Sequence, residues 1–169
     1  MATLWEGITA LIGSDTATAG LRFYLNHSIT ATAGAGAAHA LTLERKVEGP
    51  PPLFPDDASD HYPGAYMETI GPFPTAVLRG QHYECEARIR VSYIGTLSSG
   101  QRPKAQAKEY AVKITDNVMK SDRLGLDYIS LLSWAGLDDD NDVARYLPLL
   151  MPQFFVGSTL FVVQFNVEF

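Results

Sequence analysis

Apolar and polar residues alternate without a break in the run Tyr83-Glu84-Cys85-Glu86-Ala87-Arg88-Ile89-Arg90-Val91-Ser92-Tyr93. Successive side chains of a β-strand point to opposite faces, so this run predicts a long strand with one apolar face and one charged face. Residues 161–169 show the same alternation, with Phe or Val at each odd-numbered position. Together the two runs predict a sheet that packs its apolar face on a core.

The polar face of the first strand carries four ionic groups. They are Glu84, Glu86, Arg88 and Arg90. A strand of about twelve residues is roughly 40 Å long at about 3.3 Å per residue. At a sheet edge, a strand of that length promotes aggregation unless a neighbour covers or pairs it. The charged face is therefore interpreted either as a solvated sheet surface or as a surface that meets another subunit.

Length and composition predict a single globular domain. The chain has 169 residues, of which 46% are hydrophobic and 19% charged, which suits one domain over residues 1–169 with its own core. No run reaches the roughly 20 apolar residues that span a bilayer, so no membrane partner is expected. Glu6 and the lack of an early basic residue predict no secretory signal. Cys85 lies on the apolar strand face, where we expect a small buried thiol in a reducing compartment.

Charges are distributed unevenly along the chain. The formal net charge is −6, yet residues 81–124 carry eight basic and five acidic side chains, and residues 125–169 carry one basic and six acidic ones. This basic surplus is too small for a dedicated nucleic-acid-binding protein, so no sequence-specific nucleic acid is expected. Unlike patches fit a protein that meets copies of itself or a partner, and the alternative is a chance scatter of solvated charges. The candidate interface residues are Glu84, Glu86, Arg88, Arg90, Arg102, Lys104, Asp138, Asp139, Asp140 and Asp142.

The N-terminal half predicts helices first and then a proline-rich segment. Apolar residues at spacings of three and four predict a helix over 4–12 and a second short helix through 21–25. A strand is expected to emerge near 41–43 and run toward Val47. Residues 49–74 contain seven of the ten prolines and predict a long loop or arm. Within this arm, only the part from Gly64 to Ile70 is expected to form a short strand.

The C-terminal half predicts one clear helix and a less regular region. Apolar spacing predicts a helix over 107–118, with a strand in the same region as the alternative. Residues 126–137 are apolar nearly all round, so a buried helix and a strand both fit. The acidic run 138–142 is interpreted as a turn that caps a helix N-terminus. Pro148 and Pro152 predict a short, irregular stretch before the last strand.

The order of these elements predicts the α+β class. We expect a mainly antiparallel sheet backed by one or two helices, with the proline-rich excursion as an arm of the same domain.

No local motif predicts catalysis or a cofactor. Gly34 and Gly36 lack the preceding strand and the βαβ unit of a dinucleotide-binding turn. Counted from Asp138, a calcium loop would need glycine and glutamate where Val143 and Leu149 stand. The four histidines are scattered singly, and none has the i, i+4 spacing of a zinc-binding helix. We therefore predict no catalytic residue, no cofactor and no metal ion.

The order of elements resembles the tail-terminator and related neck proteins of long-tailed bacteriophages. A helix over 4–12 opens the chain, a proline-flanked strand over 63–72 precedes the long strand 83–93, a helix over 107–118 follows, and a strand closes it. The resemblance implies a small α+β structural protein without catalytic residues. It implies a homo-oligomeric ring, commonly a hexamer, that terminates the tail tube at its head-proximal end. The implied partners are the tail-tube protein and the head connector or other neck proteins, in a virion assembled in the host cytoplasm.

Two other functions stay open at this point. Another head–tail joining or capsid-associated structural protein shares nearly all of these expectations. A small intracellular enzyme or ligand-binding domain would instead build a pocket from the proline-rich loop and residues 126–150. The side chains expected to line that pocket are His61, Tyr62, Tyr66 and Trp134.

Overall fold

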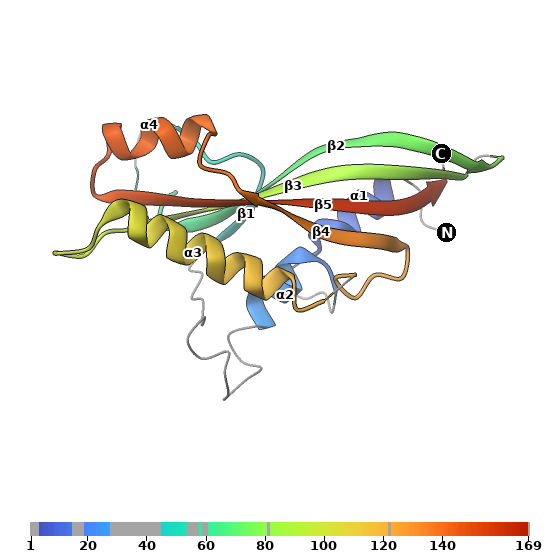
Figure 1. Ribbon diagram of the computed structural model, residues 1–169, viewed down its shortest axis with the longest axis horizontal. Coiled ribbons are helices and arrows are strands. Elements are labelled where there is room, and N and C mark those ends of the chain that lie inside the picture. The colour runs from blue at the N-terminus through green and yellow to red at the C-terminus, as the bar shows by residue number, and fades with distance from the viewer. Residues whose placement is uncertain are drawn as a thin grey trace.

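A computed structural model describes residues 4–14, 19–27, 45–53, 58, 61–80, 82–121 and 123–168. Figure 1 shows these residues as an elongated molecule built on one twisted sheet, with helices on both faces. The described elements are α1 (Leu4–Ile12), α2 (Leu21–His27), β1 (Lys46–Glu48), β2 (Gly64–Arg79), β3 (His82–Thr96), α3 (Pro103–Val118), β4 (Ile129–Leu137), α4 (Asp142–Leu150) and β5 (Phe154–Glu168). The predicted α+β class is confirmed.

The described strands form a sheet of order β1-β2-β3-β5-β4. β1 pairs parallel with β2, and the other neighbouring pairs are antiparallel. β3 and β5 pair along their whole length, from His82 opposite Glu168 to Thr96 opposite Phe154. The two alternating runs are thus adjacent at the centre of the sheet, and both strand predictions are confirmed. β5 begins seven residues earlier than the alternation indicated.

β2 corrects the prediction for the proline-rich segment. We expected a short strand from Gly64 to Ile70, but β2 continues through Pro72 and Pro74 to Arg79. β1 pairs with β2 only at residues 65–67, so the rest of that side of β2 pairs with no described strand. Proline is tolerated on such a side because no ladder hydrogen bond from its nitrogen is needed there. The ladder with β3 also shifts register at both prolines, as expected of bulges.

The helix predictions hold over 4–12, 21–25 and 107–118, where α1, α2 and α3 are found. α3 begins earlier than predicted, because Pro103 suits the first helical turn. The ambiguous apolar stretch is the strand β4. The stretch predicted as irregular is the helix α4, which contains Pro148.

α4 forms in spite of its proline because its other features favour a helix. The side chain of Asn141 accepts a hydrogen bond from the backbone N–H of Ala144 at 3.0 Å, which caps the helix N-terminus. Leu147 is fully buried and anchors α4 on the sheet. The interpretation of the acidic run as a helix-capping turn is confirmed.

β1 confirms the strand that was predicted to run toward Val47. Its expected start near residues 41–43 lies outside the described residues, as do Gly34, Gly36 and Phe169.

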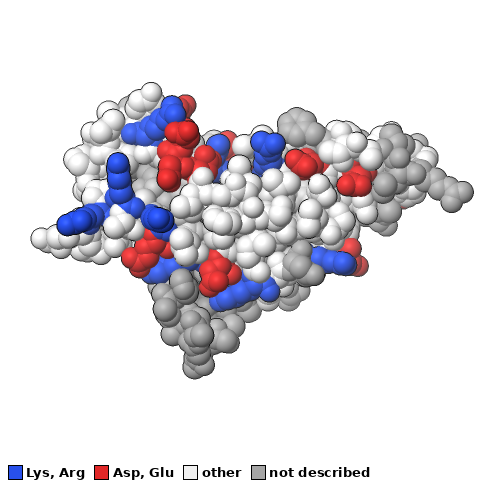
Figure 2. Space-filling view, in the orientation of Figure 1, with Lys and Arg blue, Asp and Glu red and all other residues white. Residues whose placement is uncertain are grey.

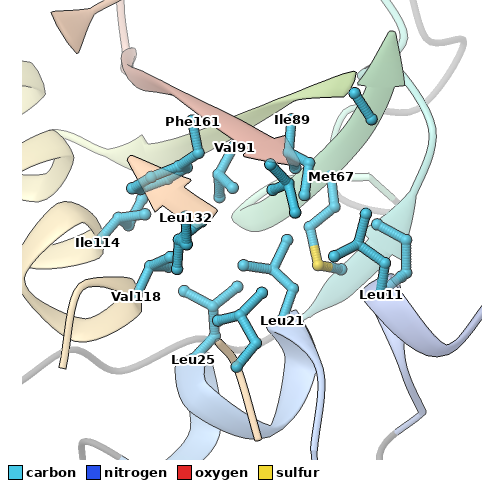
Figure 3. Packing of buried hydrophobic residues seen from close by; sticks show 14 of the residues in the cluster. Leu11, Leu21, Leu25, Met67, Ile89, Val91, Ile114, Val118, Leu132 and Phe161 are labelled. Carbon is cyan, nitrogen blue, oxygen red and sulfur yellow. The ribbon is translucent and has the colours of Figure 1, made fainter. Parts of the chain in front are cut away.

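The main core lies between one face of the sheet and α1, α2 and α3 (Figure 3). The odd-numbered residues of β3 and β5 face this core, so that Cys85, Val91 and Phe161 are buried. The ring of Tyr93 stacks on that of Tyr110 in α3, with centroids 4.6 Å apart. α3 also approaches β5 closely at Gly157, where a Cβ atom would lie 2.4 Å from the carbonyl oxygen of Ala107.

A second, smaller core lies on the opposite face, under α4 and close to one end of the sheet. Leu147 of α4 packs there with Tyr62, Tyr66, Ile94 and Val156. Among the described elements, α4 is thus the helix that covers this face, and it covers only the end where β5 begins (Figure 1).

Candidate functional site

The part of this second face that lies beyond α4 forms the first candidate surface, which we call the open face. It is built by the even-numbered residues of β2, β3 and β5 and by Leu131 of β4, which lies opposite Gln164. Its members are Glu68, Ile70, Glu84, Glu86, Arg88, Arg90, Leu131, Leu160, Val162, Gln164, Asn166 and Glu168. Leu131 is 46% exposed, although it is a large apolar residue on a strand. The open face therefore mixes apolar side chains with ionic ones.

Arg90 is the centre of an ionic network on the open face. Its Nη1 lies 3.0 Å from the Oε2 of Glu68, and its Nε donates to the carboxylate of Asp138, which follows β4. Burial alone would lower the pKa of Arg90. Asp138 and Glu68 outweigh this effect through their hydrogen bonds and negative charges, and they raise the pKa of Arg90 above its ordinary value. The sequence placed Arg90 in a basic interface patch and Asp138 in an acidic one. In the structure the two residues form an ion pair with each other within one chain.

Other polar groups of the open face are also paired across strands. The Nδ1 of His82 lies 3.4 Å from the Oε1 of Glu168, and the side-chain amide of Gln164 donates to Glu86 at 3.5 Å. Burying a paired charge costs less free energy than burying an isolated one. The partners given to Arg90, Glu168 and Glu86 within the chain therefore lower the free-energy cost of covering this part of the open face.

The acidic turn before α4 is partly neutralised inside the chain as well. Asp138 binds Arg90, and the Oδ1 of Asp140 lies 2.9 Å from the Nη2 of Arg145. Asp139 and Asp142 are exposed. This turn is therefore a helix cap in which two of the four carboxylates form ion pairs within the chain.

A groove of about 850 Å³ between α3 and α4 forms the second candidate surface. Its floor is the start of β5, at Phe155 and Val156. The α3 side is lined by Arg102, Pro103, Lys104, Ala107 and Lys108, and the α4 side by Asp139, Ala144, Arg145, Pro148 and Leu149. Figure 2 shows Lys and Arg side chains gathered at this end of the molecule. The groove is apolar at its floor and basic along α3.

The basic side of the groove keeps its charge. Arg102, Lys104 and Lys108 are exposed, and none forms an ion pair with another described residue. The first turn of α3 contains no acidic residue, and Arg102 at its N-cap makes no side-chain capping bond. The positive end of the helix dipole therefore adds to the three cations.

The structure divides the predicted interface residues between these two surfaces. Glu84, Glu86, Arg88 and Arg90 lie on the open face, and Arg102, Lys104 and Asp139 line the groove. Asp138 and Asp140 form internal ion pairs, and Asp142 is exposed in the first turn of α4 on neither surface. Sequence reasoning missed the apolar floor of the groove and Lys108, Arg145 and Leu149 on its walls. No local pattern indicates them, because the groove joins α3 to the later segment that forms α4 and the start of β5.

The pocket expected for a ligand-binding domain is not assembled. Tyr62 and Tyr66 are buried under α4, and their hydroxyls donate to the carbonyls of Pro52 and His61. Trp134 lies at the sheet edge on the other face, where its Nε1 donates to Thr159, which in turn bonds to Thr115 of α3. These aromatic residues therefore act as packing groups on opposite sides of the sheet.

Cys85 is fully buried, and burial raises the pKa of its thiol. The prediction of a small buried side chain is confirmed. The described residues include no group of three or more His, Cys, Asp or Glu side chains that could hold a metal ion. No described helix has the length and apolar character needed to cross a membrane.

No protein-family model fits the sequence, and no curated protein is found to be similar.

Proposed function

We propose that this protein is a structural subunit that assembles with copies of itself into a closed ring, at the head-proximal end of a phage tail. The observation that most supports assembly is that the open face is left uncovered. Two central strands of 15 residues extend beyond α4, and their even-numbered side chains are covered by no described helix. Long strands with an apolar and charge-paired outer face favour burial against a neighbour.

Exposed apolar side chains elsewhere support the same proposal. Outside the open face, Trp134 of β4 and Tyr146 and Leu150 of α4 are each about half exposed. Trp134 lies on the α3 side of the edge strand β4, whereas α4 packs on the opposite face of the sheet, so the two sets form separate patches. Two unlike apolar patches on one subunit are what head-to-tail ring contacts require.

The place of the ring in a phage tail is supported by the resemblance in element order. The sequence carries the helix, proline-flanked strand, long strand, helix and final strand in that order, and the structure has α1, β2, β3, α3 and β5 at these places. The ring would stop growth of the tail tube and present a surface to the head connector or neck proteins. This is mechanical work that needs neither a cofactor nor a catalytic residue.

Electron microscopy of the purified protein, alone and mixed with tail-tube subunits, tests this function. We expect closed rings of uniform diameter, and rings bound at one end of each tube in the mixture. Particles that stay monomeric with and without tube protein would contradict the ring. Rings that never bind tube ends would contradict the tail-terminator assignment while leaving self-assembly intact.

A further inference from the structure

The floor of the α3–α4 groove is an unpaired strand edge. β4 pairs with β5 from Phe165 only as far as Thr159, and just beyond it the N–H of Asp138 donates to the carbonyl of Ser158 at 3.0 Å. The preceding residues of β5, Phe154 to Gly157, pair with β3 on one side and with no described strand on the other. The N–H of Phe154 donates to the carbonyl of Met151 at 3.0 Å, so the part of this edge left open to the groove is at Val156.

The direction of the backbone groups follows from the ladder. In an antiparallel pair, the N–H and C=O of one residue point to the same side, and this side alternates along the strand. On the β4 side, the carbonyl of Ser158 accepts from Asp138 and the N–H of Asn166 donates to Tyr128. On the β3 side, the carbonyl of Gln153, just before β5, accepts from Leu97. Even-numbered residues of β5 therefore point away from β3. Val156 accordingly presents its N–H and C=O to the groove.

Val156 lies at the bottom of the groove and is only 5% exposed. Backbone groups in such a place are nearly always hydrogen-bonded, and no described backbone group is placed to pair with Val156 on this side. A strand laid along the edge would supply both a donor and an acceptor at the required spacing. Addition of an extended segment to a free sheet edge is a recurrent mode of peptide recognition.

The two walls specify the chemistry of such a segment. Side chains of an added strand point alternately toward α3 and toward α4. On the α3 side they meet Lys104 and Lys108. On the α4 side they meet Ala144, Pro148 and Leu149, beside Asp139 and beside Arg145, which is paired with Asp140. A segment in which carboxylates alternate with branched apolar residues matches both walls. A nucleic-acid backbone matches less well, because the floor is apolar and Asp139 stands on the rim.

We propose that the groove between α3 and α4 binds an extended acidic segment of a partner protein, which adds as a strand to β5 at Val156. The occupant carries glutamate or aspartate at alternate positions, facing α3, and apolar side chains between them, facing α4. This interaction is separate from assembly through the open face and does not depend on it.

Binding of a fluorescent synthetic peptide in which glutamate alternates with valine tests the proposal. The first comparison uses the same peptide with lysine in place of glutamate. The second uses the glutamate peptide with an N-methyl group at its central residue, which removes one hydrogen-bond donor of the backbone and keeps the charge. We expect saturable binding of the first peptide, and a loss of about tenfold or more in affinity for each of the other two.

Matched variants locate the binding. Ala144→Trp fills the groove from the α4 wall, and Ala105→Trp places the same side chain at an exposed position of α3 that does not line the groove. K104E with K108E reverses the charge of the α3 wall, and K120E with R123E makes the same charge change at exposed positions outside the groove. Each groove variant should weaken binding about tenfold or more at low salt, and each control should leave it within about twofold.

Three results would overturn the proposal. Full binding of the N-methylated peptide would show attraction by charge without strand addition. Absence of saturable binding to a folded, unaltered protein would show that the edge accepts no such segment. If Ala144→Trp abolished self-association and no peptide bound, a second copy of the chain would be the occupant instead. Loss of ring formation by an open-face variant that still binds the peptide would separate this inference from the proposed function.

Discussion

Arg90 and Glu68 stand directly opposite each other on β3 and β2, and their side chains form an ion pair with a nitrogen–oxygen distance of 3.0 Å. The same guanidinium binds Asp138 at the end of β4, so it joins segments from three strands. The ion pair holds the strands together at the point where the cover provided by α4 ends. The open face begins there.

Replacement of Arg90 by alanine should destabilise the fold. It leaves two carboxylates close together without their cation, and we expect a loss of about 2 kcal/mol in the free energy of unfolding. Urea denaturation measures this loss. Arg88→Ala is the matched control, because Arg88 is exposed on the same face two residues away, and its loss should stay below about 0.5 kcal/mol. Equal losses in the two variants would show that the network does not hold the strands.

Gly157 should tolerate no side chain. A Cβ there would lie 2.4 Å from the carbonyl oxygen of Ala107, so Gly157→Ala must push α3 away from β5. We expect a loss of about 2–3 kcal/mol from this overpacking. Gly100→Ala is the control for backbone strain alone, since Gly100 has a φ of +83° and no atom near its Cβ position. Its expected loss is about 1 kcal/mol. A Gly157→Ala protein as stable as Gly100→Ala would contradict the close contact of α3 with β5.

Tyr128 should make stability depend on alkaline pH. Its hydroxyl donates to the carbonyl of Gly7 at 2.6 Å, and burial, followed by the charge of Asp127, raises its pKa to about 12. The stability that it contributes is fully present below the unfolded pKa of about 10 and is lost as the pH rises toward about 12. Burial also raises the pKa of Tyr62 to about 12, so both residues contribute to this loss.

The variant Tyr128→Phe separates the two contributions. At neutral pH it should lose about 1 kcal/mol, which is the net value of one hydrogen bond. Between about pH 10 and 12 its free energy of unfolding should fall less steeply than that of the unaltered protein. The remaining slope comes from the other groups whose pKa burial raises, Tyr62, Tyr66 and Cys85. Identical slopes for both proteins, measured by chemical denaturation at each pH, would show that Tyr128 titrates as it does in the unfolded chain.

Cys85 should be chemically inert in the folded protein. The thiol is fully buried, and its raised pKa keeps it protonated near neutral pH, whereas the thiolate is the reactive form. A thiol-specific disulfide reagent should therefore react at the rate of unfolding, and immediately in denaturant. Rapid reaction under native conditions would place Cys85 outside the core.

The sheet could be predicted from sequence because β3 and the second half of β5 are amphipathic. Each alternates over most of its length, and period-two alternation is the strongest local signal for a strand with one buried face. Alternation does not reveal which neighbours a strand has in the sheet. Pro72 and Pro74 therefore indicated that β2 ends before them. The strand continues because β1 pairs with only three of its residues, and the side that β1 leaves unpaired can accept prolines.

The candidate surfaces were harder to predict because they depend on contacts between distant segments. Asp138 belongs to an acidic run, and nothing near it indicates that Arg90, 48 residues away, is its partner. The groove depends on where β4 stops relative to β5. This register leaves Val156 paired with β3 on one side and with no described strand on the other. Composition indicated basic and acidic regions, but only the arrangement of α3 and α4 shows which charges line one groove.

The solution mass of the protein over a wide concentration range tests the central claim, assembly through the open face, most directly. Leu131→Glu and Val112→Glu form a matched pair, because these residues are 46% and 39% exposed and only Leu131 lies on the open face. We predict a discrete oligomer of the 18.5 kDa chain for the unaltered protein and for Val112→Glu, and a monomer for Leu131→Glu. A monomer in all three cases, or an unchanged oligomer in Leu131→Glu, would contradict the account.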